Sequence, residues 1–133
     1  MAWFSCRRAR IGRQAGAVRL GASLWEIPPG EAAYPFHYHL AEEEMIVVLS
    51  GRPSLRTDSG WRELETGDVN RGHEPVRMLA LSTAAQPEVV VQPDSGKVGA
   101  FERLPEGGGM RLWFRRADAV EYLDGESAPG SSP

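Results

Sequence analysis

Two histidines and a nearby glutamate form the pattern in this sequence that is best suited to chemistry. His37 and His39 are separated only by Tyr38. On an extended strand the side chains at i and i+2 project from the same face, so both imidazoles can point at one metal ion. Glu44 follows at an odd separation, which would place it on the opposite face of an unbroken strand. We therefore expect a turn over residues 40–42, after which Glu44 can return towards the two histidines.

The residues after Glu44 predict a strand that is apolar on both faces. Every position from Met45 to Leu49 is apolar, although successive side chains must point in opposite directions. Such a pattern is typical of an inner strand that is buried on both faces. An unpaired buried charge is costly, so the Glu44 carboxylate would have to be paired, protonated or bound to a metal. Shared coordination with the two imidazoles would satisfy it.

Short strand patterns separated by turn residues run through most of the chain. Turn residues such as Pro28-Pro29-Gly30 end one strand, and Asp58-Ser59-Gly60 joins two others as a hairpin. No segment is typical of a sustained amphipathic helix. Regular short strands with turns between them indicate an all-β sandwich or barrel. The expected strands cover residues 20–27, 44–49, 55–57, 61–64, 76–83 and 88–91.

Length and composition restrict the class of protein. A chain of 133 residues is expected to form one domain. Its single cysteine, Cys6, cannot form an internal disulfide. The longest apolar run, residues 45–49, is far shorter than the roughly 20 residues of a membrane-spanning helix. The N-terminal charges follow a very short apolar stretch, which does not resemble a secretory signal. We expect a cytoplasmic protein with no membrane partner.

The N-terminal segment is basic, because five arginines precede the first acidic residue, Glu26. An arginine-rich start is compatible with a nucleic-acid-binding arm or an organelle transit peptide. The arginines are spread out rather than forming a dense block, which favours a solvated edge strand. We do not expect nucleic acid to be a partner. The five arginines are Arg7, Arg8, Arg10, Arg13 and Arg19.

Taken together, Gly30, His37, His39, Glu44 and Gly51 resemble the first motif of the cupins, in particular small single-domain bacterial cupins. In that motif a glycine precedes a His-x-His pair, and six residues separate the glutamate from a second glycine, as they do here. The resemblance implies a single double-stranded β-helix, or jelly-roll barrel. It also implies that His37, His39 and Glu44 are metal ligands.

Two alternatives to this ligand set stay open. Glu43 is the rival for the carboxylate role because the motif also allows a separation of one residue fewer, although the spacing to Gly51 favours Glu44. The second alternative has no metal at all: His37 and His39 would simply lie in a loop, and Glu44 would be solvated like its acidic neighbours.

The second cupin motif is largely absent. Gly67 and Asp68 resemble its start and Asn70 its end, but only Asp68 and Val69 lie between them, where cupins have a strand and the last histidine ligand. Losing a strand from the middle of a barrel would expose two edges. We hypothesise that a stretch is missing from the sequence between Val69 and Asn70. The alternative, that His73 replaces the lost ligand, is less favoured because His73 lies in a predicted turn.

We expect three segments along the chain: a basic N-terminal segment (1–19), the cupin barrel (20–92), and a C-terminal non-barrel arm with a frayed tail (93–133). Within the arm, residues 110–115 are predicted to form one more strand or to pack on a partner. Small cupins resemble one another in forming pairs, so we also expect a homodimer.

Two functional hypotheses follow from the metal-ligand pattern. The site would hold one divalent transition metal, Fe, Mn, Ni or Zn, since two histidines and a carboxylate with open positions accept several metals. The first hypothesis is a metal-dependent enzyme, of isomerase or dioxygenase type, acting on a small organic acid or sugar-phosphate-like molecule. The second is a non-catalytic small-ligand-binding or sensing cupin, because a fold alone does not decide function.

Overall fold

The computed structural model describes residues 4–64, 74–102, 104 and 108–125. Strands account for most of the regular structure, and the helices are single turns. In chain order the elements are β1 (Arg7–Ala9), α1 (Ile11–Gln14), β2 (Gly21–Ile27), β3 (Tyr38–His39), β4 (Glu44–Ser50), β5 (Ser54–Thr57), β6 (Gly60–Glu63), β7 (Val76–Ser82), β8 (Glu88–Gln92), η1 (Pro93–Ser95), β9 (Lys97–Phe101), β10 (Arg111–Arg115) and η2 (Arg116–Asp118).

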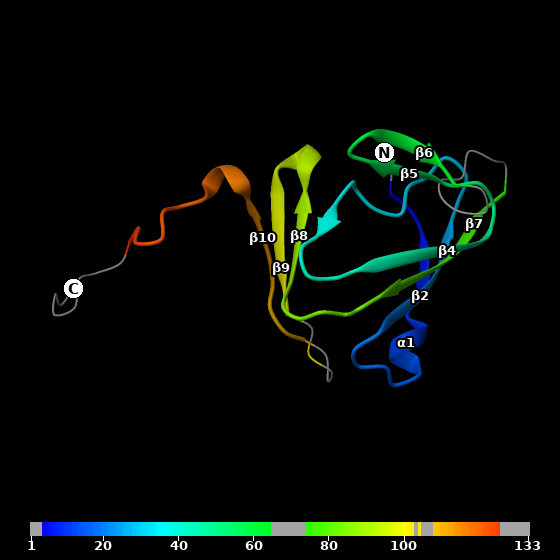
Figure 1. The fold of residues 1–133 in the computed structure, drawn as a ribbon, viewed down its shortest axis with the longest axis horizontal. Helices are drawn as coiled ribbons and strands as arrows, with labels where there is room; N and C mark the ends of the chain where they lie inside the picture. Colours follow the sequence, from blue (N-terminus) through cyan, green and yellow to red (C-terminus); the bar gives the residue numbers. More distant parts are fainter. Residues whose placement is uncertain (1–3, 65–73, 103, 105–107, 126–133) are drawn as a thin grey trace.

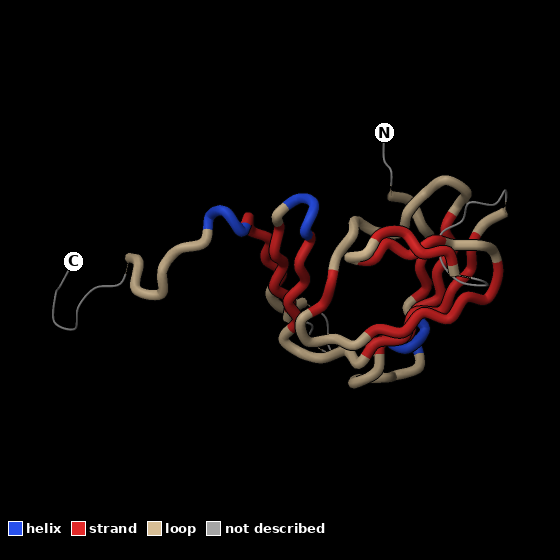
Figure 2. Tube along the Cα trace, turned by 45° about the horizontal axis from the view of Figure 1, so that its top comes forward, coloured by secondary structure: helices blue, strands red, loops and turns tan. Residues whose placement is uncertain are grey.

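The described strands form two four-stranded sheets and a separate hairpin, all with antiparallel pairing. The first sheet has the order β1-β2-β7-β4, the second has the order β10-β9-β8-β3, and β5 pairs with β6. Figure 1 and Figure 2 show the two sheets side by side, with the chain after η2 running away from both. The all-β prediction is confirmed.

Strands β2 and β7 supply the centre of the core. Trp25 and Ile27 from β2 cluster with Val76, Met78 and Ala80 from β7, and all five are buried. Alternate residues of β7 point inwards, as the sequence pattern over 76–83 predicts. Burial of each large apolar side chain stabilises the fold by about 2 kcal/mol. The first sheet therefore has a well-packed, buried face on the side of Trp25.

Strand β4 differs from the prediction of an inner strand buried on both faces, which is wrong. Its only neighbour among the described strands is β7. The outward side chains Met45, Val47 and Leu49 are 56%, 40% and 53% exposed, while Ile46 and Val48 pack against the core. An apolar sequence on both faces does not reveal how many elements will cover a strand. That depends on where the rest of the chain lies.

The second sheet continues beyond residue 92. The turn η1 ends in Gly96, which has a left-handed conformation with φ of 61°, and leads into β9, a strand that the sequence analysis did not predict. Strand β10 pairs with β9 along its whole length, so the strand predicted over 110–115 is confirmed. Its residues are exposed, although the Trp113 ring contacts Phe101 at 5.2 Å between centroids and the Arg111 guanidinium lies 5.5 Å from the centroid of the same ring. The division at residues 19 and 92 stays a prediction.

The basic N-terminal segment forms strand β1 at the outer edge of the first sheet. Its three residues are exposed and pair with β2. Arg7 and Arg77 both lie near Glu26, at 3.8 Å and 3.1 Å between the nitrogen and oxygen atoms. The predicted edge strand is thus confirmed for Arg7 and Arg8, whereas Arg10, Arg13 and Arg19 lie outside β1.

Gly51 occupies the turn between β4 and β5, where no other residue would be accommodated easily. Its φ of 92° lies in the region that disfavours L side chains. An added Cβ would also lie 2.8 Å from Cγ2 and 2.9 Å from Cα of Val76, which is fully buried. This second glycine of the motif is therefore needed for the backbone conformation and for packing against Val76, whether or not a ligand is bound.

The hypothesis of a missing stretch between Val69 and Asn70, and the alternative ligand His73, fall outside the described residues. Within the described part of the chain, no helix is long and apolar enough to cross a membrane.

Candidate metal site

Strand β3 brings the two histidines together. It pairs with β8, so that Tyr38 lies opposite Val91 and His39 lies opposite Val90. The rings of His37 and His39 lie 5.0 Å apart between centroids, whereas Tyr38 between them is 44% exposed. The arrangement expected from the i, i+2 spacing is observed, with both imidazoles on one side of the chain.

His37 is held by the backbone just before it. Its Nδ1 atom lies 2.9 Å from the carbonyl oxygen of Pro35. A carbonyl oxygen only accepts, so Nδ1 of the neutral ring carries the proton and donates, and Nε2 keeps a free lone pair. The Tyr34 ring packs edge-on against the imidazole at 5.9 Å between centroids. His37 is therefore oriented to offer Nε2 as a ligand.

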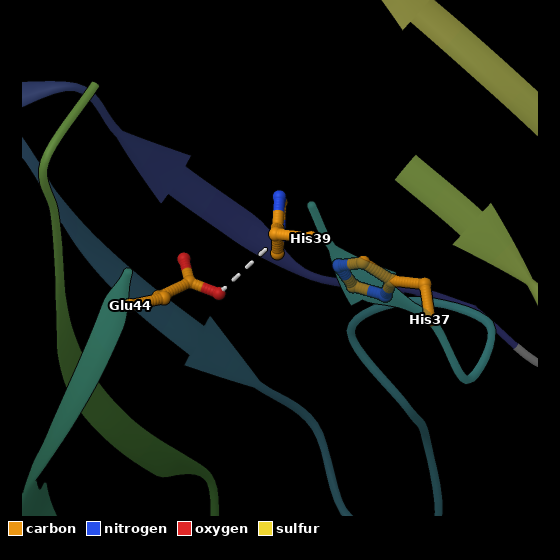
Figure 3. Close-up of side chains that lie close together, drawn as sticks. All are labelled: His37, His39 and Glu44. Atoms are coloured by element: carbon orange, nitrogen blue, oxygen red, sulfur yellow. Dashed lines mark ion pairs between the residues drawn. The ribbon is translucent and has the colours of Figure 1, made fainter. Parts of the chain in front are cut away.

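Glu44 returns to the histidines at the start of β4, after the turn that the sequence predicts. Its Oε2 lies 3.8 Å from Nε2 of His39 (Figure 3). One ligand atom each from His37, His39 and Glu44 lies within 4.8 Å of the others. A transition metal holds such nitrogen and oxygen ligands at about 2.0–2.2 Å, so two ligands of one ion lie at most about 4.4 Å apart. The separation of 3.8 Å between His39 and Glu44 meets this limit.

Glu44 is not buried, contrary to what the sequence analysis expected for the first residue of an inner strand. Its side chain is 39% exposed, because β4 lies at the edge of its sheet. Burial therefore does not force this carboxylate to find a partner. Its place in the candidate site depends on its approach to His39.

Glu43, the alternative carboxylate ligand, makes two hydrogen bonds to Thr83 through its own backbone. Its amide N–H donates to the Thr83 hydroxyl at 3.1 Å, and its carbonyl accepts from the Thr83 amide at 3.0 Å. Among the described residues, the group of possible ligands around His37 contains Glu44 and not Glu43.

Two carboxylates that the sequence analysis did not select lie on the other side of His39. Nδ1 of His39 is 3.6 Å from Oε1 of Glu88 and 3.9 Å from Oε2 of Glu42. Glu88 is completely buried, and the Glu42 side chain is only 4% exposed. Glu88 directly precedes the apolar residues of β8, so the reasoning applied to Glu44 would have found it.

An aromatic and cationic group lies beside His37. The Arg8 guanidinium stacks over the Trp25 ring at 4.4 Å, and its Nη1 donates to the Tyr34 hydroxyl at 3.2 Å. Burial raises the pKa of Tyr34, and the charge of Arg8 only partly offsets that effect. The Tyr34 hydroxyl therefore stays protonated at neutral pH.

Comparison with known proteins agrees with this architecture. A family model for the cupin domain matches residues 23–70, a range that includes His37, His39, Glu44 and Gly51. A solved structure from Acidithiobacillus ferrooxidans, provisionally named a sugar phosphate isomerase, superposes with a TM-score of 0.75. It is 23% identical over 87% of this chain and 80% of its own. Residues 23–70 are therefore similar to the cupin domain, and the fold of the chain agrees with a cupin-type jelly roll.

A second solved structure supports the jelly-roll prediction for this chain. A sugar phosphate isomerase of the cupin superfamily from Silicibacter pomeroyi DSS-3 superposes with a TM-score of 0.74, at 22% identity, over 90% of this chain and 82% of its own. At such identities the likeness establishes the fold. No curated protein matches the sequence.

The donor set of this candidate site is suited to a divalent transition metal. Two imidazole nitrogens and one carboxylate oxygen are a ligand set used by iron and other first-row metals. Nδ1 of His37 is already engaged, and Nδ1 of His39 faces carboxylates, so both rings can present Nε2 to the same point. The residues present therefore fit a metal, and the set does not select between Fe, Mn, Ni and Zn.

Proposed function

We propose that this protein is a metal-dependent isomerase of the cupin type that acts on a small sugar-phosphate-like substrate. The observation that carries the proposal is the convergence of ligand atoms from His37, His39 and Glu44 within 4.8 Å of one another. The substrate class is supported by the names of the two similar structures, both of which are called sugar phosphate isomerases.

In this proposal each residue of the group has a defined part. His37, His39 and Glu44 would hold one divalent ion and leave part of its coordination sphere open. When bound, such an ion supplies Lewis-acid stabilisation for substrate oxygen atoms. The Pro35 carbonyl keeps the His37 ring in the orientation and protonation form that a ligand needs.

A substrate can approach from the side of Glu44. A depression of about 690 Å³ borders this residue, and its lining includes Ile46, Leu55, Leu64 and Arg62. Arg62 makes no ion pair within the part of the chain that the structure describes. Its guanidinium is thus available to a phosphate or carboxylate group, which it can bind through two parallel hydrogen bonds.

Metal analysis of the purified protein tests the site. We expect close to one transition-metal ion per chain, and its loss in His37→Ala or His39→Ala, because each substitution removes one of three ligands. Tyr38→Ala is the matched control, since it lies between the two histidines and is 44% exposed. Inductively coupled plasma mass spectrometry gives the stoichiometry. Full metal occupancy in a folded double variant lacking both histidines would refute the assignment.

The catalytic part is tested by mixing the metal-loaded protein with aldose and ketose phosphates and following interconversion by NMR. We expect turnover that disappears in His37→Ala. Binding of these compounds without any conversion would instead favour the non-catalytic ligand-binding alternative.

A further inference from the structure

Glu88, the first residue of β8, is a buried carboxylate with an unusual set of neighbours. Its side chain has no exposed surface. Oε1 lies within hydrogen-bond range of two backbone N–H donors, at 3.3 Å from Leu40 and 3.5 Å from Ala41. Those donors belong to the turn that connects His39 to Glu44. Glu88 therefore ties together the segment that brings two of the three candidate ligands into one place.

The same carboxylate faces the His39 ring. Nδ1 of His39 lies 3.6 Å from Oε1 of Glu88, and its imidazole is only 16% exposed. Neither this Nδ1 nor Oε2 of Glu88 has a hydrogen-bond partner among the described residues. On the opposite side of the ring, Nε2 points to Glu44. His39 thus separates a buried carboxylate from the candidate metal position.

A neutral imidazole has one donor nitrogen and one acceptor nitrogen. If Nε2 carried the proton, the lone pair of Nδ1 would face the oxygen atoms of Glu88 and Glu42. Carboxylate oxygens only accept, so that tautomer would bring like partial charges together in a buried place. The opposite tautomer donates from Nδ1 to the buried carboxylates and turns the Nε2 lone pair towards Glu44, which is farther away and partly exposed to solvent, and towards an ion when one is bound.

We propose that Glu88 is a positioning residue for His39: it holds the proton on Nδ1, fixes the ring, and thereby directs the Nε2 lone pair towards the metal position. The effect on metal binding rests on the proposed function, whereas the effect on the tautomer does not. A carboxylate behind a ligating histidine raises the basicity of that ligand. The separation of 3.6 Å exceeds a hydrogen-bond distance, so the proposed bond requires the imidazole and the carboxylate to move closer together.

Glu88 is better placed than Glu42 to position the His39 ring. The Glu42 oxygen lies farther from Nδ1, at 3.9 Å, and three residues along the same loop. Glu88 belongs to β8, which is paired with β3 on one side and β9 on the other, so its backbone is held by a sheet. Its position does not depend on the conformation of the loop that it supports.

The tautomer of His39 can be measured directly by ¹⁵N NMR of the metal-free full chain at a pH where the ring is neutral. We expect wild-type His39 to carry its proton on Nδ1 and Glu88→Gln to move it partly or wholly to Nε2. The substitution keeps the side-chain shape but removes the negative charge, so the group that faces Nδ1 holds the proton there less strongly. His37 is the internal control, because the Pro35 carbonyl should keep its proton on Nδ1 in both proteins. An unchanged His39 tautomer in Glu88→Gln would overturn the proposal.

Titration with Co²⁺ measures the consequence for the metal. We expect Glu88→Gln to weaken binding by about 10- to 100-fold, as loss of an outer-shell partner typically does. Glu43→Gln removes the same charge from the neighbouring turn and should leave the affinity within about twofold of wild type. Equal affinities for Glu88→Gln and wild type would contradict the proposal. If wild type bound no metal, the proposed function would fall, and the NMR result would still decide whether Glu88 positions His39.

Discussion

His39 lies between two sets of acidic side chains, with Glu44 on one side and Glu88 and Glu42 on the other. One ring nitrogen approaches Glu44 at 3.8 Å, and the other approaches Glu88 at 3.6 Å. Each imidazole nitrogen can make one directed contact. A buried carboxylate that orients one nitrogen of the ring therefore also fixes the direction of the other nitrogen, which faces the candidate metal site. At the residue scale, the geometry of this site is therefore set from both sides of one imidazole.

The choice between Glu43 and Glu44 can be tested at the same scale. We expect Glu44→Gln to weaken Co²⁺ or Mn²⁺ binding by more than the roughly 100-fold that an outer-shell change costs, because it removes a ligand charge. Glu43→Gln changes net charge equally and should have little effect, because Glu43 contacts Thr83 mainly through its backbone. Isothermal titration calorimetry gives both affinities. A larger loss in Glu43→Gln than in Glu44→Gln would reverse the assignment.

At the scale of elements, the turn from β4 to β5 shows how a motif residue contributes through the backbone. Gly51 lies against Val76, the fully buried first residue of β7. The close approach lets β4 lie beside β7 at the end of the strand, where the register between the two shifts at Val48/Ser50. This end of β4 is therefore fixed by packing, whereas its first residue, Glu44, is placed by the preceding turn.

We expect Gly51→Ala to destabilise the protein by about 3 kcal/mol. Part of this loss comes from the positive φ, and the rest comes from overpacking against Val76. Gly30→Ala is the matched control: its φ is 76°, but nothing lies within 4 Å of an added Cβ, so a loss of about 1 kcal/mol is expected. Urea denaturation measures both. Equal losses would show that contact with Val76 adds nothing.

At the scale of the whole molecule, a charged pair links the hairpin to the second sheet. Arg56 in β5 donates through both terminal nitrogens to Asp94 in η1, with 2.8 Å between Nη2 and Oδ1. The guanidinium also stacks over the Phe36 ring at 4.5 Å. The pair therefore joins residues from three different parts of the barrel.

This link predicts a dependence of stability on pH. Hydrogen bonding to Arg56 lowers the pKa of Asp94 below its ordinary value of 3.8. A carboxylate with a lowered pKa in the folded state contributes stability above that ordinary value, and the contribution is lost as the pH falls through the folded pKa. We expect Asp94→Asn to be less stable than wild type at pH 7 and to approach it below about pH 3.8.

Urea denaturation at several pH values checks this prediction, and Arg56→Gln provides the control. In the Arg56→Gln background, the Asp94→Asn substitution should have no further effect at pH 7. High salt should also reduce the difference, because the pair is exposed. A difference between Asp94→Asn and wild type that stayed constant down to pH 3 would exclude the pair as its source.

Oligomeric state also belongs to this scale. The homodimer that the cupin resemblance implies stays a prediction. So does the missing stretch between Val69 and Asn70, which lies outside the described residues.

The sequence by itself determined the features that follow from local periodicity. The spacing of His37 and His39, the turn before Glu44 and the alternation along β7 depend on neighbouring residues and on the repeat of an extended chain. Gly30, the first glycine of the motif, was likewise predicted to lie in a turn. These features predicted an all-β fold, and the resemblance to the first cupin motif implied the jelly roll and the three candidate ligands, without any knowledge of long-range contacts.

Only the tertiary structure decided how the strands are covered and what lies behind the ligands. Apolar residues on both faces of β4 predicted an inner strand, yet its exposure depends on having β7 as its single described neighbour. Glu88 reaches the turn at Leu40 across 48 residues of sequence, through the pairing of β3 with β8. Local spacing fixes which side a residue faces, whereas contact across a sheet depends on strand order and register, and those are set by the packing of the whole chain.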